Sequence, residues 1–487
     1  MVFSKDESPV CDIKLSSIGP GYITGQGAAQ ELNGMDLAMK LHYIRNVYYF
    51  RSQVFEGLAI MDIKEPMFYW LNYGYIACGR LRRHDSGRPY IKCNDCGVRF
   101  IEARCKLTLD EWLESKDDSR HKLLVSNQVL GPDLLFSPLV LFQLTKFKCG
   151  GISVGLSWAH ILGDVFSAVS YTNIWGQITK RHFPTQPLRM EHSMKENCNP
   201  KSPTKDPLAV KRVGPVGDHW TTSDNTKLET YSFYISSPEF IRLQTKLCGG
   251  KDNNQHFPPF ELICTIVWQC VAKAKHESEV NMVTICKRDS KMSFEGVITN
   301  KAQSIKVVKT NISVKESSLM ELGMLILNQG VDERSNIEEA MKPDNELPDF
   351  IIYGANLTFI DLSDAPLYEL DIKGNTPVYV NCAIDGVGEE GVVLVFPARK
   401  DMSDGMTISI TLPANHISEL KSVLWNEWSL ASLLLKCGNY KNSILKYEIV
   451  LSMVLSVLPK VEFYVRFYLN IFQKIFGFTF LPVITEI

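Results

Sequence analysis

Residues 147–164 read F-K-C-G-G-I-S-V-G-L-S-W-A-H-I-L-G-D. The glycine pair near the start of this stretch is typical of a hairpin turn. Alternating residues over 152–160 are typical of a β-strand, and the apolar run P-L-V-L-F-Q-L-T-K-F at 138–147 predicts a buried strand before the turn. The two strands should pair as a hairpin, and the second should end at His160.

A helix should begin directly after this strand. Its apolar residues recur at the spacing of one helical face, and Asp164 stands immediately before them, where an N-cap residue is expected. His160 therefore lies at a predicted strand-to-helix junction, a common location for functional residues. The apolar residues of this helical face are Val165, Ala168, Val169, Ile174, Trp175 and Ile178.

His160 and Asp164 form the pattern H-x-x-x-D. A neutral imidazole at this junction could act as a general base toward an attacking hydroxyl or amine, which contributes about 10²–10⁴-fold in rate. Asp164 could hold the loop in shape, or it could only cap the helix. Because the pattern is short and common by chance, a histidine kept for structure is the other interpretation. Trp158 is predicted to be a core residue.

Composition excludes several classes of function. The 487 residues are enough for two or three domain-sized units, and the net charge of -2 argues against a nucleic-acid-binding protein. The 13 cysteines are scattered, odd in number and not preceded by an apolar leader, which indicates a reducing, cytosol-facing protein. Cys93 and Cys96 form the one C-x-x-C, but no second pair stands at ligand spacing, so we predict no metal site.

The chain divides by changes in sequence character. Residues 184–228 are rich in proline and charge and lack periodicity, which predicts a crossover linker between an N-terminal unit at 1–183 and a C-terminal unit at 229–424. Residues 425–487 form an atypical apolar tail in which no uncharged run reaches the length of a membrane span. The tail is either an interfacial amphipathic segment or a sequence not selected to fold.

Both units should mix strands and helices. In the N-terminal unit we predict a strand over 35–50 and a helix within 66–83. In the C-terminal unit we predict helices near 237–248 and 260–275. The strands predicted in the C-terminal unit are at 282–286, 304–308, 353–360, 376–382, 391–396 and 406–411.

Four motifs, taken in order, resemble the BAHD acyltransferase superfamily. Besides residues 147–164, they are M-D-L-A at 35–38, A-C-G-R-L at 77–81, and F-E-L-I-C-T-I-V-W at 260–268. The resemblance extends over roughly 10–424. It implies an α/β fold of two similar chloramphenicol-acetyltransferase-like domains of mixed sheet and helices.

The family resemblance also implies how the site would work. His160 would be the general base at the interface of the two domains, in a channel open to both faces. Acyl-CoA would enter from one side and the acceptor from the other. Asp164 would support the loop, and Trp268, which matches a family tryptophan, is predicted to be core.

A narrower resemblance is to the plant Eceriferum-2-like clade, on L-G-P-D-L-L-F-S-P-L-V at 130–140 and Y-G-A-N-L-T-F at 353–359. It implies a role in very-long-chain fatty acid elongation and cuticular wax biosynthesis, at the cytosolic face of the endoplasmic reticulum. The implied partner is a ketoacyl-CoA synthase of the elongase. Acyl-CoA is the possible substrate, no cofactor is expected to be tightly bound, and the protein should be monomeric apart from its partner.

The sequence departs from the enzyme pattern at three places. Where the family carries D-F-G-W-G, this chain has D-I-K-G-N, which keeps Asp371 and Gly374 as structural support but loses the aromatic residues. Val165 replaces the glycine that usually follows H-x-x-x-D. The arginine that pairs with the motif aspartate in the family has no direct match, and Arg288 rather than Lys287 is predicted to take its place.

Three functions remain open at this point. The first is an accessory of the wax elongase in which catalysis is dispensable. The second is a working acyl-CoA-dependent acyltransferase that uses His160 as its base. The third is a non-functional isoform whose tail exposes apolar surface.

Overall fold

In the computed structural model of the chain, Met1–Ser432 make one compact unit, and every described residue belongs to it. The predicted tail lies outside the described residues from position 431 onward, so both interpretations of it stay predictions. The structure describes residues 8–52, 57, 59–115, 117–190, 206–222, 226–247, 256–275, 279–289, 296–342, 347–399 and 404–430.

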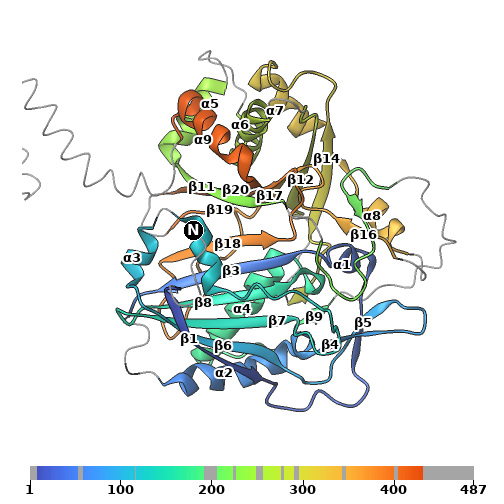
Figure 1. Cartoon of the computed structure of the whole chain (residues 1–487), viewed down its shortest axis with the longest axis vertical. Coiled ribbons are helices and arrows are strands. Elements are labelled where there is room, and N and C mark those ends of the chain that lie inside the picture. The colour runs from blue at the N-terminus through green and yellow to red at the C-terminus, as the bar shows by residue number, and fades with distance from the viewer. Residues whose placement is uncertain are drawn as a thin grey trace, which may run out of the picture. The chain divides into compact units, whose positions relative to one another are not determined.

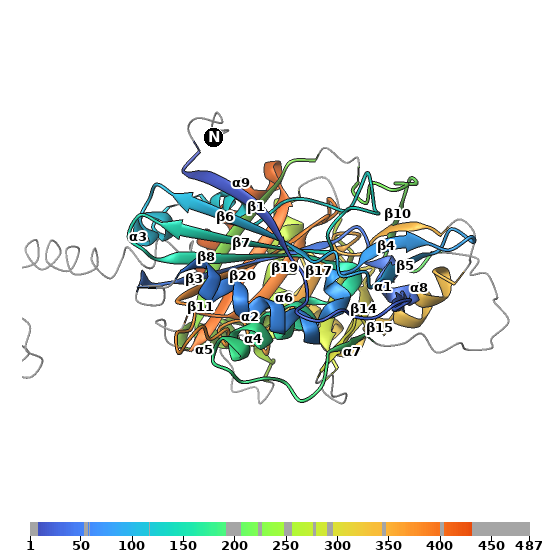
Figure 2. The same cartoon turned by 90° about the horizontal axis from the view of Figure 1, so that it is seen from below.

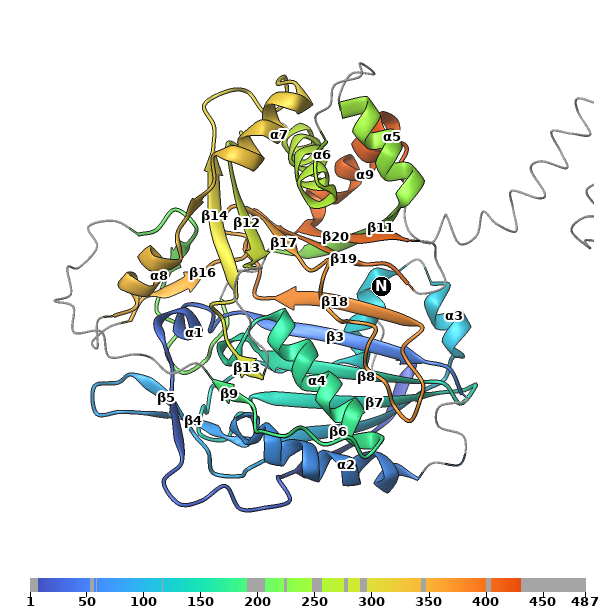
Figure 3. The same ribbon diagram turned by 180° about the vertical axis from the view of Figure 1, so that it is seen from behind.

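A six-stranded sheet, called the first sheet, organises the N-terminal part of the described chain. Its strands lie side by side in the order β1-β6-β7-β8-β3-β18 (Figure 1), and the first five of them are also labelled in the view from below (Figure 2). Helices α2 (Ile60–Tyr73) and α4 (Val165–Thr179) cover one face of this sheet (Figure 3). The strands are β1 (Val10–Ile18), β3 (Tyr43–Phe50), β6 (Val98–Cys105), β7 (Val140–Phe147), β8 (Ile152–Ala159) and β18 (Tyr379–Asp385).

The predicted hairpin and the helix after it are confirmed. Strands β7 and β8 pair antiparallel with Lys146 opposite Ile152, and α4 begins after its N-cap Asp164. All residues of β8 are buried, because this strand lies inside the sheet with both of its faces covered. The alternation along β8 therefore separates two packed faces and does not separate core from solvent.

The predicted strand over 35–50 is correct only in its second half. Its first half is helix α1 (Gly34–Ala38), because Asn33 and Asp36 form a capping box in which each side chain accepts a hydrogen bond from the other's backbone N–H, both at 3.0 Å. The helix predicted within 66–83 is α2, which starts earlier and ends at Tyr73. The C-G-R-L motif that follows leads into β4 (Arg80–Arg83).

A second large sheet of seven strands, in the order β11-β20-β19-β17-β12-β14-β15, organises the C-terminal part of the described chain. Helices α5, α6, α7 and α9 lie on one face of this second sheet (Figure 1). The helices near 237–248 and 260–275 are confirmed as α5 (Ser237–Leu247) and α6 (Pro259–Ala274). The strands are β11 (Leu228–Ser236), β12 (Met282–Arg288), β14 (Gln303–Lys309), β15 (Val331–Asp332), β17 (Leu357–Asp361), β19 (Val392–Pro397) and β20 (Gly405–Pro413).

The α/β fold class is confirmed, and each sheet has its own apolar core. Trp158 and Trp175 lie in the core beside the first sheet, and Trp268 lies in the core beside the second, as predicted. Helix α9 (Ala414–Trp428) extends past position 425, and Trp428 and Leu430 are buried in the second core. The first residues assigned to the tail therefore belong to the fold.

Strand β18 connects the two sheets. The chain before it (β17) and after it (β19) lies in the second sheet, but β18 pairs antiparallel with β3 at the edge of the first sheet. The strand predicted at 376–382 thus exists, but it completes the sheet of the other half.

Shorter elements fill the connections between these layers. No helix in the described ranges is long and apolar enough to cross a membrane. Helix α7 (Leu319–Asn328) belongs to the helical layer of the second sheet. The other elements are β2 (Ala29–Glu31), β5 (Pro89–Lys92), α3 (Leu109–Leu113), β9 (Arg189–Met190), β10 (Lys211–Val213), β13 (Val297–Ile298), α8 (Arg334–Ala340) and β16 (Asp349–Ile351).

Candidate functional site around His160

His160 lies where β8 ends and a short 3₁₀ turn leads to α4. Its backbone N–H donates to the carbonyl of His42 at 3.1 Å, which ties the turn to the loop before β3. The indole N–H of Trp158 donates to the carbonyl of Gly163 at 2.9 Å, and this hydrogen bond links the end of β8 to the end of the turn. The histidine is therefore held in place by backbone bonds on both sides of the turn.

Both ring nitrogens of His160 have a partner from the C-terminal part of the chain. Nδ1 lies 3.0 Å from Oδ1 of Asn300, and Nε2 lies 3.1 Å from the hydroxyl of Tyr353. The amide nitrogen of Asn300 donates to Asp36 at 3.0 Å and to the carbonyl of His160 at 2.9 Å. Because that amide nitrogen is a donor, Oδ1 must accept, so Nδ1 of His160 carries the proton and Nε2 accepts from Tyr353.

The imidazole is fully buried and neutral. Its side chain has no exposed surface in the described structure, so the open channel implied by the family resemblance does not reach it here. Burial lowers the pKa of His160 to about 4, and the bonds from its own backbone and from Asn300 oppose that shift without reversing it. The tautomer is the one that a general base needs, but its lone pair faces the hydroxyl of Tyr353.

Tyr353 is itself fixed by a second buried histidine. Nε2 of His42 accepts from the backbone N–H groups of Ile352 at 3.1 Å and Tyr353 at 3.4 Å. The two rings of His42 and Tyr353 lie 4.8 Å apart. Burial, together with the neighbouring His160, lowers the pKa of His42 to about 3, so it too stays neutral and keeps accepting these bonds.

Asp164 caps α4. Its Oδ1 accepts from the backbone N–H of Ser167 at 2.8 Å, and its own N–H donates to the carbonyl of Thr299 at 3.1 Å. Burial raises the pKa of Asp164 to about 6, while the bonds to Ser167 and the attraction of Arg288 act in the opposite direction. Its Oδ2 has no hydrogen-bond partner among the residues that the structure describes.

Neither predicted cation forms an ion pair with Asp164 in the part of the chain that the structure describes. The guanidinium of Arg288 lies over the ring of Phe166, two residues after the cap, at 4.8 Å, and reaches Asp164 only through longer-range attraction. Lys287 pairs with Glu261 at 2.9 Å. The geometry gives Asp164 a capping role, and the support expected from Arg288 stays a prediction.

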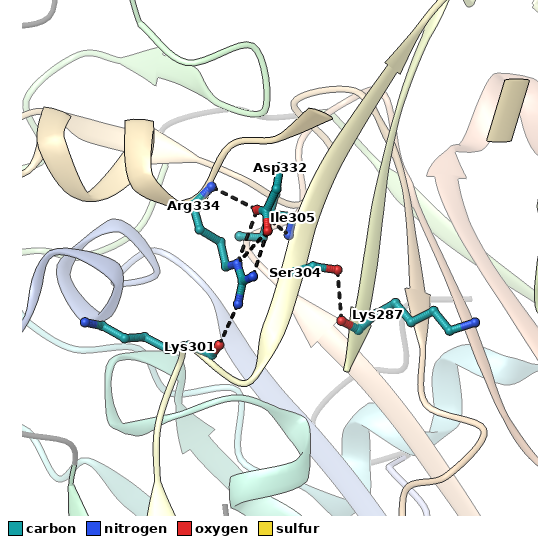
Figure 4. Close-up of polar contacts among 6 residues, drawn as sticks. All are labelled: Lys287, Lys301, Ser304, Ile305, Asp332 and Arg334. Carbon is teal, nitrogen blue, oxygen red and sulfur yellow. Dashed lines mark hydrogen bonds and ion pairs between the residues drawn. The ribbon is translucent and has the colours of Figure 1, made fainter. Parts of the chain in front are cut away.

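The turn that carries Asn300 is anchored from the second sheet. Arg334 donates a hydrogen bond to the carbonyl of Lys301 at 3.0 Å. Its Nε and Nη2 also donate to the carboxylate of Asp332, at 2.9 Å and 2.7 Å (Figure 4). On the adjacent pair of strands, Ser304 donates to the carbonyl of Lys287 at 3.1 Å. Arg334 thus holds the backbone next to Asn300, the residue that orients His160.

The D-I-K-G-N loop lies at the other end of α4. Asp371 pairs with Lys180 at 2.9 Å and accepts from the backbone N–H of Gly374 at 2.6 Å. Gly374 has φ +89°, and Ile372 is buried. Because α4 spans 15 residues, this loop is about 22 Å along the helix from His160. Asp371 and Gly374 brace α4 and do not touch the imidazole.

The sequence motifs contained part of this site. Asp36 belongs to the M-D-L-A motif, and Tyr353 begins Y-G-A-N-L-T-F, but these motifs indicate a family and do not place either residue beside His160. His42 and Asn300 stood in no motif, and nothing in a single sequence marks them. They are brought to His160 by the junction of the two halves of the described chain.

The cysteines of the C-x-x-C pair are free, with Cys93 buried and Cys96 exposed. Within the described ranges no cluster of three or more His, Cys, Asp or Glu side chains could hold a metal ion. The polar groups around His160 are hydrogen-bonded mainly to one another.

Comparison with known proteins identifies the family. The model of the transferase family matches residues 28–425. The chain belongs to the BAHD transferase family. It is 40% identical to Protein ECERIFERUM 26 of Arabidopsis thaliana over 418 residues, covering 85% of this chain and 95% of that protein. It is 35% identical to Protein ECERIFERUM 2 of the same plant, covering 86% and 99%. The resemblance to the Eceriferum-2-like clade is therefore confirmed.

Solved structures agree on the fold. The crystal structure of vinorine synthase matches with a TM-score of 0.66 at 15% sequence identity, covering 87% of this chain and 98% of that one. At this identity the likeness shows the fold of this BAHD family member and no more.

Proposed function

We propose that this BAHD protein acts in cuticular wax biosynthesis as an accessory of very-long-chain fatty acid elongation. It would work beside a ketoacyl-CoA synthase at the cytosolic face of the endoplasmic reticulum, where acyl-CoA is elongated. Kinship with the Eceriferum proteins supports the setting. One observation carries the accessory role. The hydroxyl of Tyr353 donates a hydrogen bond to Nε2 of the fully buried His160, so the lone pair of that nitrogen is already engaged.

A general base must reach the proton that it removes, directly or through one water. His160 meets neither condition here, because its Nε2 is already an acceptor and no part of its side chain is exposed. The same residue joins β8 of the first sheet to Asn300 and Tyr353. We infer that His160 serves as a structural tie between the two halves, on a scaffold inherited from acyltransferases.

The second candidate is a catalytically active acyl-CoA-dependent acyltransferase with His160 as general base and a hydroxyl or amine acceptor. One observation favours it: Asn300 holds the imidazole in the tautomer that leaves Nε2 free of a proton. This enzyme would require Tyr353 to turn away when acyl-CoA and acceptor bind.

Acyl-CoA profiling separates the two candidates. A host that expresses a plant wax ketoacyl-CoA synthase would receive the wild type, His160→Gln, or no protein. Glutamine can still donate and accept hydrogen bonds but cannot act as the base. The matched control is His121→Gln, which removes a partly buried histidine that is hydrogen-bonded to the hydroxyl of Tyr49.

Longer acyl chains with both the wild type and His160→Gln would support the accessory. Longer chains with the wild type and His121→Gln, but not with His160→Gln, would favour the acyltransferase. No change in chain length with soluble wild type would contradict the proposed function. Co-purification of the synthase with the wild type tests the partner directly.

A further inference from the structure

A groove opens at the end of β8 opposite to His160, and the function proposed above does not use it. We call it the β1–α2 groove; it has a volume of about 560 Å³, within the range of roughly 300–1,000 Å³ typical of small-molecule sites. Ile152, at the start of β8, lines it. Eight residues of strand separate Ile152 from His160, a distance of about 26 Å.

The groove is lined by aliphatic and by charged side chains, and its isoleucine and leucine residues come from four elements. Strand β1 contributes Ile13, which is 62% exposed, and the first turn of α2 contributes Ile60 and Ile63. Leu144 of β7 and Ile152 of β8 complete this lining. Exposed apolar residues that are rimmed by charged ones mark ligand-binding grooves or interfaces.

The rim carries an excess of positive charge. Arg104 of β6 and Lys146 of β7 are direct neighbours in the strand register, an arrangement of like charges that is unfavourable by itself. Arg104 meets Asp12 only at 3.7 Å. Neither Lys146 nor Lys14, which stands opposite Glu102 in the register, forms an ion pair with any residue that the structure describes.

Both acids of the rim, Asp12 and Glu102, face a cation. Glu102 pairs with Lys64 of α2 at 2.6 Å, and that ammonium also lies over the ring of Phe100 at 4.8 Å. An occupant with one apolar chain and one anionic end would fill the aliphatic walls and satisfy the free cations of the rim.

We propose that the β1–α2 groove binds a single-chain amphiphile with a carboxylate head, namely a free long-chain fatty acid. The chain lies along Ile13, Ile63 and Leu144, and the carboxylate meets Lys146 and Arg104. This site is independent of the function proposed for the His160 centre, and its test does not involve elongation.

Isothermal titration calorimetry with the full chain and laurate tests the proposal. Laurate stays monomeric at the concentrations needed, and dodecanol and acetate supply its chain and its head separately. We expect one saturable laurate site, with binding of dodecanol and of acetate at least about tenfold weaker, equivalent to about 1.4 kcal/mol each.

Two exposed positions of the groove can be changed without touching the core. Lys146→Glu and Ile13→Asp should each weaken laurate binding at least about tenfold. The matched controls make the same chemical changes outside the groove: Lys148→Glu in the turn after β7, and Ile23→Asp, a residue 89% exposed. Both controls should leave binding unchanged.

Three results would overturn the proposal. The first is wild type without a saturable laurate site, including the case in which it binds lipid vesicles but not monomeric laurate. The second is an equal loss in the control variants. The third is laurate binding that His160→Gln abolishes and the groove variants leave unchanged, which would place the bound laurate beside His160.

Discussion

At its N-terminal end α4 meets a dry network of polar side chains, whereas at its C-terminal end it meets a partly exposed loop. Both ends correspond to family motifs, H-x-x-x-D and the loop that reads D-I-K-G-N here. The first keeps its residues, and almost every polar atom around His160 has a partner. The second has lost its aromatic residues and depends on an ion pair between Lys180 and Asp371, each about 30% exposed.

The difference teaches how a scaffold can keep a catalytic motif for another reason. A buried hydrogen-bond network is costly to break, because a polar group left unpaired in the fold has lost its hydrogen bonds to water without forming others in their place. An exposed ion pair contributes little and tolerates change. His160 and Asp164 would therefore persist as structural residues even if the chemistry that they served elsewhere in the family were lost.

The largest expected effect tests the network directly. Asn300→Leu removes the partner of His160 Nδ1, of the His160 carbonyl and of Asp36. We expect a loss of about 3 kcal/mol or more in the free energy of unfolding, since each buried unpaired group costs roughly 1–3 kcal/mol. Denaturant titration measures it. The control Asn311→Leu, on the surface, should change stability by less than about 0.5 kcal/mol.

The pH dependence of the free energy of unfolding tests the burial of His160 in a second way. The pKa of His160 is about 4 in the fold and near 6.5 when unfolded, so the unfolded chain takes up a proton there first. Lowering the pH from 6.5 to 4 should therefore reduce the free energy of unfolding, on the order of 3 kcal/mol from this residue. Asp164, with a raised pKa of about 6, partly offsets the loss because its folded carboxyl binds a proton first.

The slope with pH identifies the residue responsible. His42 and His121 have lowered pKa values and act in the same direction as His160. Denaturant midpoints at several pH values for wild type and His160→Gln should show a shallower slope in the variant. Equal slopes would mean that the imidazole is accessible to protons in the folded state.

The third effect is smaller and concerns the one hydrogen bond that Nε2 of His160 accepts, from the hydroxyl of Tyr353. Tyr353→Phe leaves the lone pair of His160 unpaired in a dry site, and we expect a loss of about 1–2 kcal/mol in stability. Tyr22→Phe, at a residue 74% exposed, is the matched control and should be neutral. If the two variants are equally stable, water or another group reaches His160, and the case for a closed centre fails.

The smallest effect belongs to the loop end of α4. Gly374 has φ +89° with open space where a side chain would go, so Gly374→Ala should cost only the backbone strain, about 1 kcal/mol. Gly214→Ala, also in open space but without a positive φ, should cost less. Thermal unfolding compares the two. A loss as large as that of Asn300→Leu would show that both ends of α4 matter equally.

The sequence was sufficient to predict the local elements but not the hydrogen-bond network around His160. The hairpin before His160, the cap at Asp164 and the buried tryptophans follow from turn residues, spacing and capping, which act over a few residues. Tyr353 and Asn300 lie 193 and 140 residues from His160, and no local pattern links them. The departure of α1 from the predicted strand has a local cause, the Asn33–Asp36 capping box, and the spacing of these two residues is a signal present in the sequence.

The crossing of β18 has a consequence for synthesis of the protein. Strand β3 ends at Phe50, but the strand that covers its edge begins only at Tyr379. At about 5–20 residues per second, a ribosome needs on the order of tens of seconds to make the segment between them. During that time the nascent chain exposes an unpaired apolar edge, which is the kind of surface that chaperones bind and that aggregation starts from. A message cut short before this strand would yield a first sheet in which β3 stays an unpaired edge.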